Sequence, residues 1–555
     1  MATRGDWRPY LIDDVRSMRG LYTKFAHDLW REYSLNMNSF MTISQLAYHA
    51  WRMTLEQPVH KMSFEMDRWV RRGVFGGRCY PCKQFYESPD ADKTYCEIQD
   101  YLVYLDVQSE YPSSMLSRHP DFPEWDFRYP DGKFYSKYWI TGETQEERDN
   151  LERYRGLFNT AQCKKLCILE VELELPTHLI SAPLPHKDEC GFTRWSFEPS
   201  ARAPQVYTSV DILRGIKYGY RIKKLFKILI FARKKRLFDE YIVKGFQRKC
   251  NARKNTAAYS IAKLSINAIF GKMLQRPYTK KKETCKNVND FEKVRLKGNL
   301  TRMYRLTNRS LQVEYEPFDH ANKDKFVTHP SYLGAFILSY SRVIMDYYID
   351  LIDGYANPKT TYYRGDTDSF LAHSSQLDTF RKYLKPATLG MLDFDIKGKI
   401  IRFCEVAPKL YICVYVTAEN ERKLHVRAKG YGKEEQADLT WDHYMHMMGK
   451  NDLAATPPRI LETLYENHTT LLPAPTASGR TKCLSNGQIQ SEVKSIKRCG
   501  LGKLSSNQLK NGIENNSITS VVVKRTLNKT PWRKRRHIEG DPEMLSVAWG
   551  SNYKL

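Results

Sequence analysis

Two aspartates separated by one residue, Asp366 and Asp368, stand between apolar segments and constrain the fold more than any other feature. The segment TTYYRGDTDSFLAHS, at 360–374, predicts a strand, a turn and a second strand. Carboxylates at positions i and i+2 of such a hairpin project to the same side and repel each other. The apolar flanks argue against a solvated Asp-rich turn and favour a bound divalent cation. Mg²⁺ is preferred where phosphates complete the shell of ligands.

A third aspartate, Asp106, lies near the end of another apolar run. The segment YLVYLDVQ, at 101–108, predicts a buried strand. An ionised carboxylate at the end of a buried strand costs free energy unless it is paired or binds a metal. Taken alone, Asp106 is explained more simply as a cap of the turn before Pro112.

A helical segment, AAYSIAKLSINAIFGKM, carries Lys263, Asn267, Phe270 and Gly271 at the spacing i, i+4, i+7 and i+8. One face of this helix therefore offers an ammonium group, an amide, an aromatic ring and a glycine notch. A cation can hold a triphosphate, and a ring beside a glycine can press on a base pair. Taken alone, the same pattern fits an amphipathic surface helix.

The charge of the chain favours a polyanionic partner. The 555 residues, 41% of them hydrophobic, are enough for several cores, so we expect several subdomains. Lys and Arg number 88 against 63 Asp and Glu, which gives a formal net charge of +25. Nucleic acid is the obvious partner for such an excess, although a merely soluble basic protein fits the charge equally well.

The 12 cysteines are scattered along the chain, as in a reduced intracellular protein. Cys79 and Cys82 form one CxxC pair with Cys96 nearby, but no second pair has zinc-site spacing, so a metal site there stays open. The N-terminal residues contain no apolar signal segment, and the longest apolar runs are too short to cross a bilayer. We therefore expect a soluble protein without membrane contact.

The remaining segments predict a mixture of helices, strands and insertions. Helical patterns occupy 10–60, 331–352 and the residues from about 430 onward, and 167–176 alternates as a strand. Residues 210–275 carry a long helical pattern in two pieces, the first holding the basic cluster Arg233–Arg236. Residues 116–165 are polar and indicate an insertion, and 275–330 are too long for an ordinary connection. The tail after about 475 is rich in Ser, Asn and Lys, with a basic run at Trp532–His537.

Taken together and in this order, the motifs resemble those of family B DNA polymerases. DVQSEYPS at 106–113 resembles motif A (D-x-x-S-L-Y-P-S), and KLSINAIFG at 263–271 resembles motif B (K-x-x-x-N-S-x-Y-G). RGDTDS at 364–369 resembles motif C (Y-x-D-T-D-S). Lys409-Leu-Tyr411 resembles the K-x-Y motif that grips the primer terminus.

A further resemblance is to the protein-primed branch of viruses and mobile elements. Tyr10 and Asp14 look like the third exonuclease motif, Y-x-x-x-D. Val74-Phe-Gly76-Gly77 lies where that branch carries Y-x-G-G between exonuclease and palm. The first two exonuclease motifs are missing, so the resemblance implies a chain that does not proofread unless the sequence continues upstream.

Four positions depart from the family pattern. Glu110 replaces Leu in motif A, Phe270 replaces Tyr in motif B, Arg364 replaces Tyr in motif C, and Val74 replaces Tyr in Y-x-G-G. None of these changes removes a metal ligand. Arg364 is expected either to depress the pKa values of the two neighbouring aspartates or to contact a phosphate.

The resemblance implies an α/β (α+β) fold, a right-hand polymerase with palm, fingers and thumb, whose palm is built on an antiparallel sheet. The implied division begins with an exonuclease remnant at 1–60, the palm entry with motif A at 61–115, and a first terminal-protein-region-like insertion with palm strands at 116–210. The fingers with motif B follow at 211–274, and a second such insertion at 275–330. The palm with motif C and K-x-Y would occupy 331–430, the thumb 431–475 and a basic tail 476–555.

The resemblance also implies a two-metal site. Asp106 and Asp368 would hold two Mg²⁺ ions, with Mn²⁺ as a substitute, and the Val107 backbone carbonyl would complete one shell. Asp366 would be an outer or occasional ligand.

The implied nucleotide site lies on the helix that carries motif B. Lys263 would neutralise the triphosphate, with Lys249 or Lys254 as a second cation between which the spacing does not decide. Tyr111 would exclude a 2′-hydroxyl. Asn267, Phe270 and Gly271 would shape the pocket of the nascent base pair. The implied contacts to DNA and primer come from Ser109, Thr367, Lys409, Tyr411, Gly76 and Gly77.

The function implied is that of a DNA-directed DNA polymerase of a linear viral or mobile-element genome. Its partners would be template-primer DNA, dNTPs and a terminal protein that primes synthesis, and the enzyme would act as a monomer. In the protein-primed branch, the insertion after motif A contacts the terminal protein, and the insertion after motif B closes around DNA. The basic run Arg533–Arg536 favours the host nucleus over the cytoplasm.

Three other functions remain open from the sequence. One is a polymerase primed by an ordinary nucleic-acid 3′ end. Another is an RNA polymerase or reverse transcriptase on the same palm, against which Tyr111 and its context argue. The last is a catalytically decayed polymerase acting as a DNA-binding scaffold, against which the retained Asp106, Asp366, Asp368 and Lys263 argue.

Overall fold

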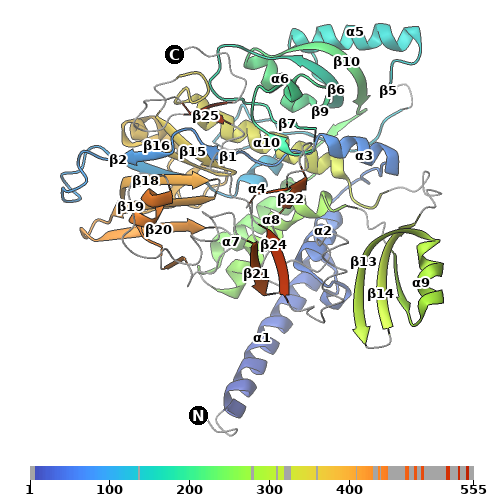
Figure 1. The fold of residues 1–555 in the computed structure, drawn as a ribbon, viewed down its shortest axis with the longest axis horizontal. Coiled ribbons are helices and arrows are strands. Elements are labelled where there is room, and N and C mark those ends of the chain that lie inside the picture. The colour runs from blue at the N-terminus through green and yellow to red at the C-terminus, as the bar shows by residue number, and fades with distance from the viewer. Residues whose placement is uncertain are drawn as a thin grey trace.

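The fold is taken from a computed structural model of the chain (Figure 1). It describes residues 7–447, except for gaps at 120, 136–137, 190, 255, 277–280, 308–309, 318–326, 358–360, 408, 429–435 and 438. Beyond residue 447 it describes only the strands β21 (Thr469–Pro473), β22 (Arg480–Cys483), β23 (Ile489–Glu492), β24 (Ser520–Lys524), β25 (Arg535–His537) and β26 (Ser546–Ala548).

The largest sheet has nine strands in the order β1-β15-β16-β3-β18-β19-β20, with β17 beside β3 and β2 beside β18. Each of its strand pairs is antiparallel. The strands are β1 (Cys79–Pro81), β2 (Phe85–Glu87), β3 (Leu102–Val107), β15 (Tyr362–Asp366), β16 (Ser369–His373), β17 (Leu392–Phe394), β18 (Lys399–Ala407), β19 (Leu410–Val416) and β20 (Arg422–Ala428). The strands predicted at 101–108 and 360–374 are confirmed.

The apolar run of β3 is explained by burial of both faces of this sheet. Val103, Leu105 and Val107 join the main hydrophobic core, whereas Leu102 and Tyr104 join a second cluster on the opposite face. Alternate side chains of a strand point to opposite faces, so a strand buried on both faces is apolar throughout. Asp106 is therefore the exception in its strand, as the sequence indicated.

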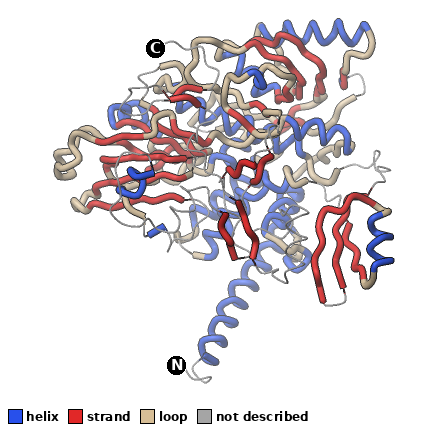
Figure 2. Tube along the Cα trace, viewed as in Figure 1, coloured by secondary structure: helices blue, strands red, loops and turns tan. Residues whose placement is uncertain are grey.

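Helices lie beside this sheet and form the rest of the central body (Figure 2). The helix α10 (Ser331–Asp350) matches the prediction for 331–352 and is buried along most of its length. It packs against α4 (Glu110–Met115) and α8 (Ala257–Met273), and α8 also packs against α7 (Asp239–Asn251) and α2 (Ile43–Met53). A Cβ at Gly334 would lie 2.5 Å from the Cγ atom of Leu274, so this glycine lets the end of α8 approach α10.

The first insertion is built on a four-stranded sheet in the order β5-β10-β6-β9. Its strands are β5 (Trp139–Ile140), β6 (Cys167–Glu174), β9 (Gln205–Thr208) and β10 (Arg221–Ile230), and its helices are α5 (Gln145–Asn159) and α6 (Ser209–Lys217). The strand predicted at 167–176 is confirmed as β6.

The helical prediction for 210–275 is wrong at 221–230, which form the strand β10. The segment RIKKLFKILI pairs along the length of β6 and buries most of its apolar side chains there. A short apolar run does not separate strand from helix by periodicity alone, and the partner strand decides here. Lys234 and Lys235 of the basic cluster likewise form a short strand, β11, beside β4 (Tyr129–Pro130). The fingers boundary expected at 211 therefore falls inside the unit of the first insertion.

The second insertion contains a folded unit at one side of the molecule (Figure 1). Three strands, β12 (Lys281–Cys285), β13 (Gly298–Thr307) and β14 (Ser310–Pro317), form a sheet in the order β12-β14-β13. The helix α9 (Val288–Arg295) packs on it, and Cys285, Val294, Val313 and Tyr315 form a small core. The described residues between Lys281 and Pro317 therefore form a folded module.

The C-terminal predictions lie largely outside the described residues. The helix α13 (Trp441–Met447) packs against β18 and agrees with a helical pattern just after 430. The helical prediction is wrong at Thr469–Pro473, which form β21, because this segment pairs with the distant strand β24. Most of the thumb range 431–475 and of the tail 476–555 lies outside, as do Trp532–Lys534 of the basic run. No helix in the described part of the chain is long and apolar enough to span a bilayer.

Candidate active site

The palm sheet brings the three aspartates to one place. Asp106 near the end of β3 lies opposite Ser369, the first residue of β16. The Val107 amide donates to the Asp368 carbonyl oxygen at 2.7 Å, which fixes the β15–β16 turn against β3. Thr367 occupies this turn with a φ of 66°, in the left-handed region. The motifs A and C predicted from sequence therefore meet through backbone pairing.

The pKa values of Asp106 and Asp368 are raised, although the charges of Lys263 and Lys409 act against the rise. Burial, and then the charge of Asp368, raise the pKa of Asp106 to about 8. Burial raises the pKa of Asp368 to about 6, and the charge of Asp366 adds to this. Two half-buried carboxyls with raised pKa values favour either protons or a bound cation.

Asp366 differs from the other two because cations surround it. The Lys409 ammonium lies 2.7 Å from one Asp366 oxygen, and the Arg364 guanidinium lies 3.4 Å from the other. Burial acts to raise the pKa of Asp366, but Arg364 and Lys409 outweigh burial and hold it below its usual value. Asp366 is thus already paired within the protein, which agrees with an outer role.

Arg364 is fully buried, so the expected phosphate contact is wrong. Its Nε atom donates to Glu405 at 2.7 Å and its Nη1 atom donates to the Tyr104 hydroxyl at 2.6 Å. Arg364 was also expected to depress the pKa values of both neighbouring aspartates. It does so for Asp366, whereas the pKa of Asp368 is raised. Glu405, also buried, is the partner that makes an arginine tolerable at this position of motif C.

The two side chains of the K-x-Y segment lie in different surroundings: Lys409 contacts Asp366 of the site, and Tyr411 lies in the core. The Lys409 ammonium donates to Asp366. Tyr411 is only 3% exposed, and the central guanidinium carbon of Arg364 lies 4.1 Å from the centroid of the Tyr411 ring. A direct primer contact by Tyr411, expected from the motif, does not fit this burial. The tyrosine instead supports Arg364, which faces Asp366.

The fingers helices contribute cations to the same site. The Lys249 ammonium donates to the Ser109 hydroxyl at 2.7 Å, just after motif A begins. Lys263 lies near enough for its charge to act on Asp106. Lys254 is exposed and has no contact of this kind among the described residues. The structure therefore favours Lys249 as the second cation, a choice that the spacing left open.

Side chains of motifs A and B are in contact with one another. The rings of Tyr111 and Phe270 stack, with centroids 4.0 Å apart and an angle of 23°. The buried Oδ1 atom of Asn267 has no hydrogen-bond partner among the described residues. No atom lies within 4 Å of a Cβ built on Gly271, which leaves open space beside the ring. Tyr111 and Phe270 are thus brought together, while the roles of Asn267 and Gly271 at a base pair stay predictions.

Glu110, which replaces Leu in motif A, is a buried carboxyl with a shifted pKa. It is 1% exposed on α4. Burial, and then the charge of Asp368, raise the pKa of Glu110 well above its usual value, which favours the neutral acid. A hydrophobic position in the family pattern is thus filled by a carboxyl whose raised pKa favours the protonated form. Nothing in the sequence indicated this shift.

Gly77 lets the segment before β1 pass close behind the catalytic turn. A Cβ at Gly77 would lie 2.8 Å from the Thr367 Cγ2 atom, which a real side chain does not tolerate. The next carbonyl, of Arg78, accepts the Thr367 amide at 2.7 Å. Gly77 of the Y-x-G-G-like segment is therefore placed at the active site.

A buried charged network ties the first insertion to this segment and was missed by sequence reasoning. Arg342 of α10 donates to both carboxylate oxygens of Asp211 on α6, at 3.0 and 2.7 Å, and to the Phe75 carbonyl oxygen at 2.8 Å. Arg214 lies against Asp211 and Asp346 in the same network. The available signal was the pair of charged residues, Arg342 and Asp346, inside an apolar helix.

Other expected site residues do not join the site. Tyr10 and Asp14 lie on α1 (Trp7–Tyr33), which projects from the body, and both are exposed (Figure 1). Cys82 is buried, and burial raises the pKa of Cys79 to about 12. In the described part of the chain, no three His, Cys, Asp or Glu side chains converge as a metal cage. A divalent ion at Asp106 and Asp368 would therefore take ligands from substrate phosphates, as Mg²⁺ commonly does.

The architecture is that of right-hand polymerases with palm, fingers and thumb. Phi29 DNA polymerase complexed with primer-template DNA is similar in structure, with a TM-score of 0.52 at 15% sequence identity over 85% of this chain and 70% of that chain. The ternary complex of the same polymerase with incoming nucleotide gives a TM-score of 0.51. The fold class expected from the motifs is confirmed.

The family profile for DNA polymerase type B, organellar and viral, matches residues 4–353, and the chain belongs to this family. A DNA polymerase of bovine adenovirus 2 is 26% identical over 266 residues, which cover 46% of this chain and 24% of the relative. A probable DNA polymerase of Neurospora intermedia is 23% identical over 412 residues, which cover 72% of this chain and 38% of the relative. The chain thus spans less than half the length of these relatives.

Proposed function

We propose that the chain is a template-directed DNA polymerase that transfers nucleotides from dNTPs to a primer hydroxyl. One observation carries the proposal: backbone pairing brings Asp106 and Asp368 together as half-buried acids with raised pKa values, while the neighbouring Asp366 is paired with Lys409 and Arg364. A pair of this kind suits divalent metals that are completed by a triphosphate.

Asp106, Asp368 and the Val107 carbonyl are the groups that would hold two Mg²⁺ ions. When bound, the ions supply activation of the primer 3′-hydroxyl and neutralisation of the leaving pyrophosphate. Asp366 keeps Lys409 in place beside the turn rather than binding metal directly. Burial raises the pKa of Glu110, which favours its protonated form beside the pair.

Residues of the fingers would bind and orient the dNTP. Lys263 and Lys249 face Asp106 and Ser109 and would neutralise the triphosphate. Asn267 and Gly271 offer an unpaired amide oxygen and an open notch to the base pair. Tyr111, fixed by its stacking on Phe270, would lie under the sugar and exclude a 2′-hydroxyl.

The two insertions support priming by a terminal protein. Each is a folded unit with its own sheet, one after motif A and one after motif B. We assign terminal-protein contact to the first and closure around DNA to the second. The enzyme would act as a monomer on a linear viral or mobile-element genome in the host cell, and the basic run Arg533–Arg536 favours the nucleus.

The test is synthesis with purified protein, Mg²⁺, dNTPs and two kinds of primer. We expect extension of an annealed DNA primer, and transfer of a labelled deoxynucleotide to a protein encoded beside this gene on a linear template. Absence of extension would refute the polymerase proposal. Extension without any protein labelling would leave a polymerase primed by ordinary 3′ ends, and DNA binding without extension would indicate a scaffold.

A further inference from the structure

The backbone of Arg78 contacts the catalytic turn. Its carbonyl oxygen accepts the amide of Thr367 at 2.7 Å, and Thr367 stands between Asp366 and Asp368. The next residue, Cys79, begins β1 and lies opposite Asp366 in the antiparallel pairing of β1 with β15. The position of the Arg78 carbonyl therefore affects both aspartates of the turn.

The side chain of Arg78 is held by the first insertion. It is 8% exposed, and its Nη2 atom donates to the carbonyl oxygens of Ala182 and Pro183, at 3.3 Å each. Its central guanidinium carbon lies 4.5 Å from the centroid of the Trp195 ring, which follows β8 (Thr193–Arg194) of the same insertion. A guanidinium is a rigid planar fork that both donates hydrogen bonds and stacks on aromatic rings, so these contacts fix its position.

Tyr355, between α10 and β15, holds the same guanidinium from the palm side. The Arg78 Nη1 atom donates to the Tyr355 hydroxyl, and the guanidinium carbon lies 4.5 Å from the centroid of the Tyr355 ring. The Tyr355 hydroxyl donates in turn to Asp346 of α10, which pairs with Arg214 of α6. Arg78 thus joins the buried network that ties the first insertion to α10.

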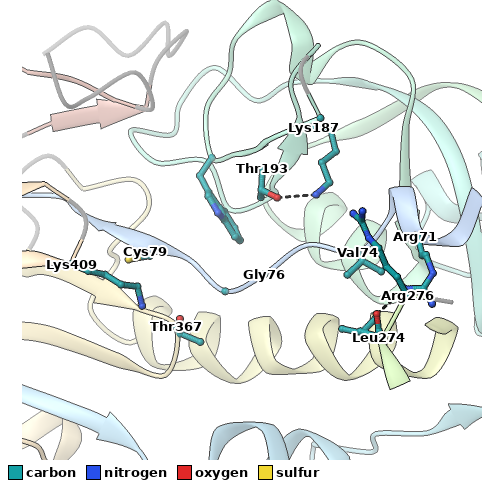
Figure 3. Close-up of a pocket in the computed structure, with 13 residues that line it drawn as sticks. Arg71, Val74, Gly76, Cys79, Lys187, Thr193, Leu274, Arg276, Thr367 and Lys409 are labelled. Atoms are coloured by element: carbon teal, nitrogen blue, oxygen red, sulfur yellow. Dashed lines mark hydrogen bonds between the residues drawn. The ribbon is translucent and has the colours of Figure 1, made fainter. Parts of the chain in front are cut away.

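A cleft lies between the first insertion and the catalytic turn beside this segment (Figure 3). Its volume is about 460 Å³, and its lining includes Trp195 of the insertion, Gly76 of the segment and Thr367 of the turn. In Figure 3 the chain near Gly76 runs between Thr193 on one side and Thr367 on the other. A displacement of the insertion therefore reaches the turn through the contacts of Arg78 rather than across the cleft.

We propose that Arg78 is a positioning residue through which the first insertion holds the catalytic turn, and with it Asp366 and Asp368, in the geometry that binds metal. The insertion fixes the guanidinium of Arg78, and the carbonyl oxygen of Arg78 fixes the amide of Thr367. The inference rests on the polymerase function proposed above. It gives the first insertion a role in nucleotide transfer itself, besides its assigned contact with a terminal protein.

Hydrogen exchange at the Thr367 amide measures this positioning directly in the full chain. Arg78→Lys keeps the charge but loses the planar fork, so it should speed this exchange by about 10-fold. Trp195→Leu should act in the same direction, although the changed side chain belongs to the insertion. Arg194→Lys is the matched control, because Arg194 is equally buried in the same insertion but pairs with Asp188 there.

The Mg²⁺ dependence of single-nucleotide incorporation is the second readout. Arg78→Lys and Trp195→Leu should each raise the Mg²⁺ concentration for half-maximal rate by about 10-fold, because residues that orient metal ligands set the affinity for the metal. Affinity for the primer-template should stay unchanged. The double variant should be no worse than Arg78→Lys alone, since both changes act through one contact.

Exchange at Thr367 equal to that of Arg194→Lys in both variants would overturn the proposal, and so would an unchanged Mg²⁺ requirement. If Arg78→Lys does not fold, Trp195→Leu decides by the same two readouts. If the wild-type chain extends no primer, the proposed function fails instead, and hydrogen exchange at Thr367 still decides whether Arg78 positions the turn.

Discussion

At the scale of the residue, the active site separates three aspartates by their surroundings. Lys409 and Arg364 hold Asp366 ionised, whereas Asp106 and Asp368 have raised pKa values. Pairs of titratable groups with opposite shifts define separate roles in an active site. Asp366 would therefore contribute to position, and the other two would contribute to metal binding.

The raised pKa values predict a pH-dependent stabilisation by Mg²⁺. A carboxyl with a pKa raised in the folded state binds more protons there than in the unfolded chain, so stability falls as pH rises through the window up to about 8. Mg²⁺ replaces those protons and should raise the melting temperature more at pH 8.5 than at pH 6. Thermal melts with and without Mg²⁺ at the two pH values measure this.

Two variants test whether the Mg²⁺ effect depends on the carboxylate of Asp106. Asp106→Asn should melt with little dependence on Mg²⁺ at either pH, whereas Asp378→Asn, at an exposed aspartate, should behave as the wild type. An equal Mg²⁺ effect at pH 6 and pH 8.5 in the wild type would contradict the assigned acid pair.

Tyr111 gives a prediction about the choice of sugar. Its ring is fixed against Phe270, so Tyr111→Val should open space beneath the sugar and raise ribonucleotide incorporation relative to deoxynucleotide by about 10-fold to 100-fold. Single-nucleotide kcat/KM values for dNTP and rNTP measure the ratio, with Tyr135→Val at an exposed site as control. An unchanged ratio would remove the steric role.

Sequence reasoning found these residues because chemistry constrains their types. Asp106, Lys263, Asn267 and Phe270 could each be named, since a charged or polar group in an apolar segment needs a reason. The state of each group could not be foreseen, because it depends on neighbours distant in sequence. Glu405, which partners Arg364, lies 41 residues away from it.

At the scale of the element, strands with apolar faces were predictable and those decided by a partner were not. β3, β6 and the β15–β16 hairpin follow from alternation and burial. β10 does not, because its apolar run fits a helix until β6 is beside it. The junction of α6 with α10 was also beyond prediction, since ion pairs between distant elements leave no local pattern.

The ion pair between Asp211 of α6 and Arg342 of α10 should affect both the stability of the protein and its activity. Arg342→Gln leaves Asp211 buried with only Arg214 to balance it, so the free energy of unfolding should fall by about 3 kcal/mol. Release of the Phe75 carbonyl should also lower kcat, because this segment runs on to Gly77 behind the catalytic turn. Denaturant unfolding and primer extension measure the two effects.

Lys217→Gln is the matched control for the junction. Lys217 pairs with Asp350 on the same two helices but is 66% exposed, and an exposed pair contributes about 0.5 kcal/mol. Equal losses of stability from Arg342→Gln and Lys217→Gln would show that the buried network has no special role.

At the scale of the whole molecule, the second insertion is a separable module. Its sheet and helix form their own small core, and residues 281–317 contain all of it. Replacing 281–317 with a short Gly-Ser linker should leave single-nucleotide incorporation within about 3-fold of wild type, an order-of-magnitude expectation from modularity. Processive synthesis and strand displacement on a long template should be lost.

The length of the DNA products shows whether the module at 281–317 is needed for processive synthesis. Unchanged product length on a primed circular template would mean that 281–317 does not close around DNA. Such a result would leave the active-site assignment intact, because the module contributes no residue to it.

The polymerase function proposed for the whole molecule depends on Asp106 and Asp368 as its metal-binding pair. The most direct measurement is primer extension by Asp368→Asn with Mg²⁺, beside its binding of the same primer-template. We predict that extension is abolished while DNA affinity is equal to or higher than that of the wild type, because a negative charge near phosphate is removed. Substantial extension by Asp368→Asn would contradict the account.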